Sequence, residues 1–260
     1  MMLTVLGSNS AVPTINSFQS AQLLELSGEN FLIDCGEGTQ MRLKQFSSKK
    51  INKINHIFIS HAHFDHFLGL PGLLNSMVLQ FNRTKPIYIY APGEVFMSLE
   101  NLLSILKDHS DFEINMVEID TGKSSVIYDN KKVAITALPL IHGKPTCGFL
   151  FEKICNIHKI KRFAYCSDTA YNENLIPLLK DVETLYHEST YSEKETAKAV
   201  KYRHSTAKQA AIFARKVNAQ QLLIGHFAGK YANPAPLLKE AKSVFENTVA
   251  VYDGFIINTI

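Results

Sequence analysis

The chain has 260 residues, of which 46% are hydrophobic and 20% are charged, and its net charge is +3 at pH 7. These proportions exclude a disordered or fibrous protein, and they suit a globular protein that we expect to form a single domain over residues 1–260. So small a net charge does not by itself indicate a nucleic-acid-binding protein.

Strands and helices alternate in the first half of the chain. The turn residues 27–30 separate two apolar runs and predict a β-hairpin. Strands are predicted at 3–6, 21–26, 31–34, 57–59, 87–90 and 115–119. Helices are predicted at 39–46, 67–79 and 95–107.

The second half is also rich in strands. A second hairpin is predicted around Asp129 and Asn130, and Ser205 or Thr206 is expected to cap a helix that ends at Lys216. A further helix is predicted at 236–245. Strands are predicted at 125–128, 132–137, 149–151, 163–166, 184–186, 221–224, 249–252 and 255–257. The pattern shows no repeat or low-complexity linker, and it indicates an α/β fold with two sheets packed face to face and helices outside.

Cysteine spacing and apolar length indicate the cellular compartment. The cysteines, none of them in a C-x-x-C pair, are Cys35, Cys147, Cys155 and Cys166. Buried free thiols are therefore expected, rather than a disulfide framework or a thiolate zinc site. No stretch is apolar enough to cross a bilayer, and the N-terminus lacks the features of a signal peptide. We expect a cytoplasmic protein that does not associate with a membrane.

A dense group of metal-binding side chains follows the strand predicted at 57–59. The sequence His61-Ala62-His63-Phe64-Asp65-His66 places four potential ligands within six residues of a loop. Imidazole and carboxylate ligands suit zinc, manganese or iron in an open hydrolytic site, whereas structural zinc usually has a closed shell of cysteines. One loop cannot supply two complete coordination shells. The sequence therefore predicts further ligands at the ends of other strands.

Three residues satisfy that requirement. His142 follows the apolar run 137–141, Asp168 follows the strand at 163–166, and His226 follows the strand at 221–224. Taken alone, each histidine could be an ordinary hydrogen-bonded residue, and Asp168 could cap a turn. Their joint occurrence with the loop at 61–66 favours metal binding. His56, His109 and His158 have no such context.

Asp34 has two open interpretations. It ends the strand predicted at 31–34 and could orient a metal-binding imidazole, or it could serve only in the turn at the end of that strand. The sequence does not decide between them.

The motif His-x-His-x-Asp-His after a strand resembles the signature of the metallo-β-lactamase superfamily, and the order His142, Asp168, His226 matches its remaining ligands. Four further segments resemble the ribonuclease Z family: Leu6-Gly7-Ser8 through Pro13, Leu32 through Gln40, His187 through Thr190, and His204 through Ala211. The resemblance covers nearly the whole chain. It implies an α/β fold of the metallo-β-lactamase type, an αβ/βα sandwich with two facing mixed sheets and outer helices.

The resemblance also implies a metal assignment. It gives His61, His63 and His142 to a first ion, Asp65, His66 and His226 to a second, and Asp168 to both. Zinc is the expected metal, and manganese stays open. Two ions about 3.5–4 Å apart can share a bridging water and lower its pKa from 15.7 toward about 7, which produces a hydroxide that attacks a phosphodiester. Asp65 is expected to orient that hydroxide.

The leaving ribose oxygen needs a proton, and the resemblance assigns this role to Glu188 and His204. The alternative is that Glu188 is a surface residue and that His204 merely precedes a helix. The match of both segments to the family favours the catalytic pair. The basic stretch nearby is interrupted by Glu193 and Glu195, so a solvated helix face is favoured over a phosphate-binding surface; its basic residues are Lys194, Lys198, Lys201, Arg203 and Lys208.

Two features depart from the family. In ribonuclease Z a long arm rich in Gly and Pro grips the tRNA elbow, but only 25 residues, 143–167, separate His142 from Asp168 here. The segment from His226 to Tyr231 reads His-Phe-Ala-Gly-Lys-Tyr, where the family has His-Phe-Ser-Ser-Arg-Tyr. Both departures concern tRNA recognition and leave the ligands in place.

The sequence thus predicts a two-metal hydrolase, a ribonuclease Z-like endonuclease that removes the 3′ trailers of precursor tRNA and acts as a homodimer. The alternative is a phosphodiesterase of the same superfamily for cyclic nucleotides or other small substrates, which the missing arm favours. A non-catalytic RNA-binding or partner subunit would be marked by the loss of a metal ligand, and every ligand is present.

Overall fold

The computed structural model describes residues 1–81, 83–107, 110–156 and 159–258. The chain divides into two compact units, which we describe separately. Unit 1 comprises Met1–Ile119 and Asp253–Asn258, and unit 2 comprises Asp120–Tyr252. That residues 1–260 form a single domain stays a prediction. No helix in the described ranges combines the length and the apolar character needed to cross a membrane.

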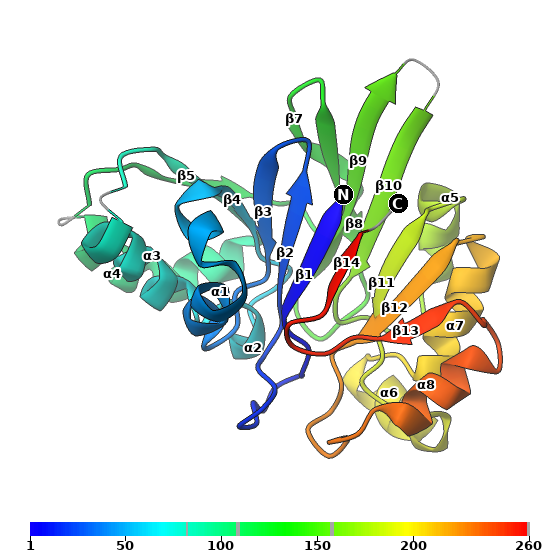
Figure 1. The fold of residues 1–260 in the computed structure, drawn as a ribbon. Coiled ribbons are helices and arrows are strands. Elements are labelled where there is room, and N and C mark those ends of the chain that lie inside the picture. The colour runs from blue at the N-terminus through cyan, green and yellow to red at the C-terminus, as the bar shows by residue number, and fades with distance from the viewer. Residues whose placement is uncertain (82, 108–109, 157–158, 259–260) are drawn as a thin grey trace. The chain divides into compact units, whose positions relative to one another are not determined.

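Unit 1 contains a mixed sheet of seven strands in the order β14-β1-β2-β3-β4-β5-β6 (Figure 1). The strands from β14 to β3 pair antiparallel, and those from β3 to β6 pair parallel. The strands are β1 (Met2–Gly7), β2 (Ala21–Leu26), β3 (Glu29–Ile33), β4 (Ile54–Phe58), β5 (Ile87–Ala91), β6 (Ile114–Glu118) and β14 (Ile256–Asn258).

The helices of unit 1 pack on this sheet through one hydrophobic core. Leu23 and Ile57 on strands lie in the same buried cluster as Leu43 and Leu73 on helices. Pro71 is the second residue of α3, where a missing backbone N–H costs nothing. The helices are α1 (Thr39–Ser47), η1 (Ser48–Lys53), α2 (Phe64–Phe67), α3 (Leu70–Phe81) and α4 (Gly93–Lys107).

Unit 2 contains a second mixed sheet of seven strands, in the order β13-β12-β11-β10-β9-β8-β7 (Figure 1). Here β10 to β13 are parallel and β7 to β10 are antiparallel. The strands are β7 (Ser125–Asp129), β8 (Val133–Pro139), β9 (Cys147–Asn156), β10 (Lys159–Cys166), β11 (Thr184–Glu188), β12 (Gln221–Gly225) and β13 (Thr248–Ala250).

A second hydrophobic core holds the helices of unit 2 on their sheet. Ala210 and Phe213 of α7 are buried in one cluster with Leu185 and Leu222 of the strands. Thr206 caps α7 in a capping box with Gln209, as the sequence predicts. The helices are η2 (Glu173–Leu175), α5 (Ile176–Leu179), η3 (Glu193–Glu195), α6 (Thr196–Tyr202), α7 (Ala207–Lys216) and α8 (Ala235–Lys242).

Two sequence-based expectations need correction. The loop predicted at 61–66 contains the first residues of α2, because the N–H of His66 bonds to the carbonyl of His63 and starts a turn too short for any apolar period to reveal. Strands β9 and β10 are longer than the predicted 149–151 and 163–166. Their outer residues carry lysines and are held by pairing between the two strands, so apolar alternation does not mark them.

Candidate metal centre

Four strands of unit 2 end at the same edge of their sheet. Strands β10, β11 and β12 are parallel neighbours, and β8 runs in the direction of β10 because each is antiparallel to β9. Glu188 ends β11, while Asp168 and His226 follow the ends of β10 and β12. His142 follows β8. The topology therefore gathers these four side chains, as expected for polar groups at the carboxyl ends of strands.

Asp168 faces two histidines through different carboxylate oxygens. Its Oδ1 lies 3.2 Å from Nε2 of His226, and its Oδ2 lies 3.8 Å from Nε2 of His142. Two nitrogens bound to one tetrahedral zinc at about 2.0–2.1 Å are about 3.3 Å apart. Asp168 thus presents one oxygen to each of two separate imidazoles, so its two oxygens could serve two different ions.

In unit 1 the loop after β4 brings its ligand atoms together in the same way. Nε2 of His61 lies 2.9 Å from Nδ1 of His63. Oδ2 of Asp65 lies 3.4 Å from Nε2 of His66. Both separations are close to the ligand spacing of about 3.3 Å around a tetrahedral ion. Each unit therefore carries pairs of donor atoms whose spacing fits neighbouring ligands of a divalent metal ion.

Asp34 orients His66. Its buried carboxylate accepts hydrogen bonds from Nδ1 of His66 at 2.8 Å, from the N–H of Ser60 at 2.8 Å and from the Ser60 hydroxyl at 3.1 Å. Because Nδ1 of His66 carries the proton, its Nε2 presents a lone pair, the form of histidine that binds a metal. Of the two interpretations of Asp34, the structure supports the orienting one.

A backbone carbonyl orients His142. Nδ1 of His142 donates to the carbonyl oxygen of Arg203 at 2.9 Å, so Nε2 is again the nitrogen with the lone pair. Burial lowers the pKa of His142 below its usual value, opposed by the charge of Asp168. The ring is therefore neutral at pH 7, as a metal ligand must be. The sequence predicts that Arg203 lies on a solvated helix face. Its contact with His142 could not be predicted, because every residue has a backbone carbonyl and the residue type does not indicate what that carbonyl binds.

Thr190 orients His226. The Thr190 hydroxyl donates to Oε2 of Glu188 at 2.8 Å, and its oxygen therefore accepts from Nδ1 of His226 at 2.9 Å. Nε2 of His226 is left with its lone pair toward Asp168. Thr190 belongs to the matching segment from His187, but no spacing rule singled it out.

Glu188 is fully buried and accepts five hydrogen bonds. Oε1 accepts from Nδ1 of His204 at 2.8 Å and from the N–H groups of Ser205 at 3.0 Å and Thr169 at 3.1 Å. Oε2 accepts from the N–H and the hydroxyl of Thr190 at 2.9 and 2.8 Å. Burial raises the pKa of Glu188, but attraction to His204 and its hydrogen bond outweigh burial and leave the pKa below its usual value.

The ionised Glu188 therefore holds His204 through Nδ1, and the His204 side chain keeps 14% of its surface exposed. Ligand-type atoms of Glu188, His204 and His226 also lie within 4.8 Å of one another. Five hydrogen bonds already occupy the Glu188 carboxylate, so this group suits proton transfer better than it suits a further metal ion.

The remaining polar candidates have structural roles. Nδ1 of His187 donates to the Glu188 carbonyl at 2.7 Å, and the ring is buried against Phe213. On the basic stretch, Lys198 pairs with Glu195 at 3.0 Å, and Lys208 pairs with Glu193. This supports the predicted solvated helix face.

The described cysteine thiols are buried, as expected, and burial raises the pKa of Cys35 and of Cys166 to about 12. The Cys155 side chain, His109 and His158 lie outside the described residues.

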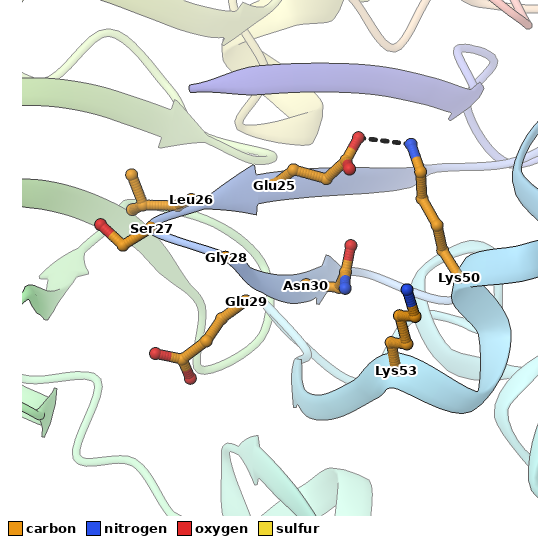
Figure 2. A pocket seen from close by; sticks show the side chains of 8 residues that line it. All are labelled: Glu25, Leu26, Ser27, Gly28, Glu29, Asn30, Lys50 and Lys53. Carbon is orange, nitrogen blue, oxygen red and sulfur yellow. Dashed lines mark hydrogen bonds and ion pairs between the residues drawn. The ribbon is translucent and has the colours of Figure 1, made fainter.

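A shallow pocket of about 280 Å³ lies at the β2–β3 hairpin, between residues 25–30 and the two lysines Lys50 and Lys53 (Figure 2). Lys50 points to Glu25 and forms an ion pair with it at 2.5 Å (Figure 2). None of the candidate ligands lines this pocket, so it is separate from the metal-binding residues.

Comparison with known proteins agrees with this geometry. The model of the β-lactamase superfamily domain matches residues 29–227. Ribonuclease Z of Azobacteroides pseudotrichonymphae is 35% identical over an alignment of 286 positions, gaps included, which covers 99% of this chain and 98% of the relative. Ribonuclease Z of Bacteroides fragilis is 34% identical over an alignment of 300 positions, gaps included, with 98% of each chain covered.

Two solved structures share the fold. Human tRNase Z, short form, superposes over the whole of both chains with a TM-score of 0.80 and 28% identity. A metallo-β-lactamase fold protein of Bacillus subtilis gives a TM-score of 0.79 at 21% identity over 98% of each chain, a likeness of fold alone. The predicted metallo-β-lactamase fold is confirmed. The chain belongs to the β-lactamase superfamily and, within it, to the ribonuclease Z family.

Proposed function

We propose that this protein is a metal-dependent endoribonuclease that cleaves precursor tRNA at the 3′ end. The observation that carries the proposal is the pairing of Glu188 with His204 beside Asp168 and its histidines. A hydrolase that used only metal ions would have no need of an ionised, fully buried carboxylate holding a partly exposed imidazole. Cleavage of RNA does need such a pair, because the leaving ribose oxygen requires a proton. The relatives named ribonuclease Z support the same reaction.

Two divalent ions, with zinc expected, would be held by the residues that carry lone pairs or carboxylates. We assign His61, His63 and His142 to one ion, Asp65, His66 and His226 to the other, and Asp168 to both. When bound, such a pair of ions activates a water for attack and neutralises charge on the phosphate. The hydrogen bonds from Nδ1 of His66, His142 and His226 to fixed acceptors support this assignment.

The chain's own residues supply orientation and a proton. Asp65 would align the attacking water while it binds an ion. Glu188 holds His204 by Nδ1, which leaves Nε2 as the atom that gives a proton to the leaving oxygen. A positioned acid of this kind typically contributes about 10²–10⁴ in rate. Glu188 stays ionised throughout and stabilises the protonated imidazole.

The test is a side-by-side assay of the purified protein on an unprocessed tRNA and on a small chromogenic phosphodiester. Endonuclease activity predicts a single cut at the 3′ side of the tRNA, which chelation abolishes and divalent metal restores. Turnover of the small ester with no tRNA cleavage would contradict the proposal and favour the small-substrate phosphodiesterase. Elemental analysis of the active protein decides between zinc and manganese.

We also propose that the protein forms a homodimer, as the family resemblance implies, and that it works in the cytoplasm, as its sequence features predict. Sedimentation of the purified protein tests the first statement, and fractionation of cells tests the second. Both stay predictions until then.

A further inference from the structure

Phe64 is an exposed aromatic residue inside the ligand motif. It lies between His63 and Asp65 in the chain and is 68% exposed, while Asp65 and His66 beside it are buried. A single exposed apolar residue is common on protein surfaces and needs no explanation by itself. Phe64 differs from other exposed apolar residues because its neighbours on both sides in the sequence are proposed metal ligands.

The Phe64 ring packs against a buried aromatic residue. Its centroid lies 5.9 Å from that of Phe67 in an edge-to-face arrangement, and Phe67 is 2% exposed and belongs to the core of unit 1. Such a contact is favourable for aromatic pairs and restricts the ring to few orientations. Phe64 therefore presents a supported ring to solvent.

The backbone that carries Phe64 is also fixed. The carbonyl of Phe64 accepts the N–H of Leu68 at 3.0 Å, and the carbonyl of His66 accepts the N–H of Cys35 at 2.7 Å. Because Asp34 further holds His66 by its side chain, the position of Phe64 relative to the ligands is set by the fold.

We propose that the Phe64 ring stacks on an unpaired nucleobase next to the cleaved phosphodiester; the inference rests on the proposed function. Consecutive Cα atoms are only about 3.8 Å apart, so a phosphate held near His63 and Asp65 brings its own nucleotide to Phe64. Unstacked bases are commonly bound on aromatic faces, and the contact tolerates any base because each has a π face. A contact with a second protein copy is disfavoured here, since it would cover the ligand loop.

The first experiment compares Phe64→Ala with Phe64→Tyr in the metal-loaded protein. Loss of one base stack should raise KM for RNA by roughly 5- to 100-fold, with kcat little changed, and the tyrosine variant should restore the wild-type value. Methyl p-nitrophenyl phosphate has no nucleobase, so its kcat/KM should be the same in all three proteins. Leu79→Ala removes a side chain that is 73% exposed on α3 and serves as the matched control.

The second experiment reads stacking directly. A short RNA carrying 2-aminopurine next to the cleavage site should lose fluorescence on binding to the His204→Ala protein, and Phe64→Ala in that background should restore it. An abasic nucleotide at the same position should bring the wild-type KM to the Phe64→Ala level and remove the difference between the two.

Three results would overturn the inference. They are equal losses on RNA and on the base-free ester, the same loss of 2-aminopurine fluorescence with and without Phe64→Ala, and a change of sedimentation with no change in KM, which would indicate a contact between copies. If the wild-type protein cleaves no RNA, the proposed function fails. The fluorescence of bound RNA then still decides whether Phe64 stacks.

Discussion

Arg203 and His142, 61 residues apart in the sequence, hold each other through reciprocal hydrogen bonds. Nδ1 of His142 donates to the Arg203 carbonyl at 2.9 Å, and Nη1 of Arg203 donates to the His142 carbonyl at 2.8 Å. Arg203 immediately precedes His204 and has a left-handed backbone with φ 54°. The residue that orients a proposed ligand is thus also the neighbour of the proposed proton donor, so the two functions share one backbone segment.

Replacing Arg203 with glycine should weaken metal binding without unfolding the protein. Glycine suits the left-handed backbone, so stability should stay within about 1 kcal/mol of the wild type. The guanidinium bond to the His142 carbonyl is lost, while the backbone carbonyl that orients the His142 ring is kept. Loss of an outer partner typically lowers metal affinity or activity by about 10- to 100-fold, and we expect an effect near the lower end of this range. Lys131→Gly, at φ 67° in the exposed turn between β7 and β8, is the control. Competition with a chelator gives the affinities, and identical values for both variants would show that the Arg203 guanidinium does not help to hold His142 in place.

Asp168 should be needed for both metal ions. The wild-type protein should contain close to two ions per chain, and Asp168→Ala should lose most of both, since each carboxylate oxygen faces a different histidine. Elemental analysis after gel filtration measures the content. Asp129→Ala, in an exposed turn, should keep both ions. A protein that keeps one full ion after loss of Asp168 would show that the carboxylate is not shared.

The candidate ligands could be located because they follow strands whose apolar runs are visible in the sequence, and parallel strands bring their carboxyl ends together; that they bind metal stays a prediction. Asp34 was located by the same logic but its role was open. Arg203 and Thr190 could not be found, since one acts through its carbonyl and the other through a hydroxyl shared between two side chains. Short helices such as α5 were also missed, because four residues give too little apolar periodicity.

His204→Ala should keep its metal ions and lose turnover according to the leaving group. Protonation matters when the leaving oxygen is a poor one, so RNA cleavage should fall by about 10²–10⁴. A nitrophenolate leaves without a proton, so turnover of the chromogenic ester should change little. Equal losses on the two substrates would argue against the proton-donor role.

Glu188→Gln should show a stability defect that depends on pH. The pKa of Glu188 in the folded protein lies below its usual value, with burial opposed by the stronger effect of His204. A lowered pKa means that the ionised group stabilises the fold above the unfolded pKa, and that this contribution disappears as the pH falls through the folded pKa. In metal-free protein the variant should be about 3–5 kcal/mol less stable at pH 7, and the difference should shrink below pH 4.5. Urea unfolding at several pH values measures it, and a constant difference would exclude an ionised Glu188.

Precursor tRNA should bind weakly and with strong dependence on salt. In the segment 143–167, where the family arm would lie, the described residues form the strands β9 and β10 and their flanks. Arg162 in this hairpin is already bonded to Glu152 and to the carbonyl of Leu178. Lys153 and Lys161 lie directly opposite each other in the pairing of β9 with β10 and could contact phosphates. Like charges in that register disfavour the hairpin unless an anion lies between them.

A remote grip on the tRNA elbow supplies binding energy that positions the 3′ end, so its absence should raise KM for precursor tRNA relative to relatives that carry the arm. Small phosphodiesters should be cleaved at comparable rates. Binding that rests on scattered lysines is mainly electrostatic, so its affinity falls steeply between about 50 and 200 mM salt. Filter binding and processing assays over a salt series measure both effects, with Lys153→Ala/Lys161→Ala testing the hairpin. Tight tRNA binding that persists at high salt would show that another element replaces the arm.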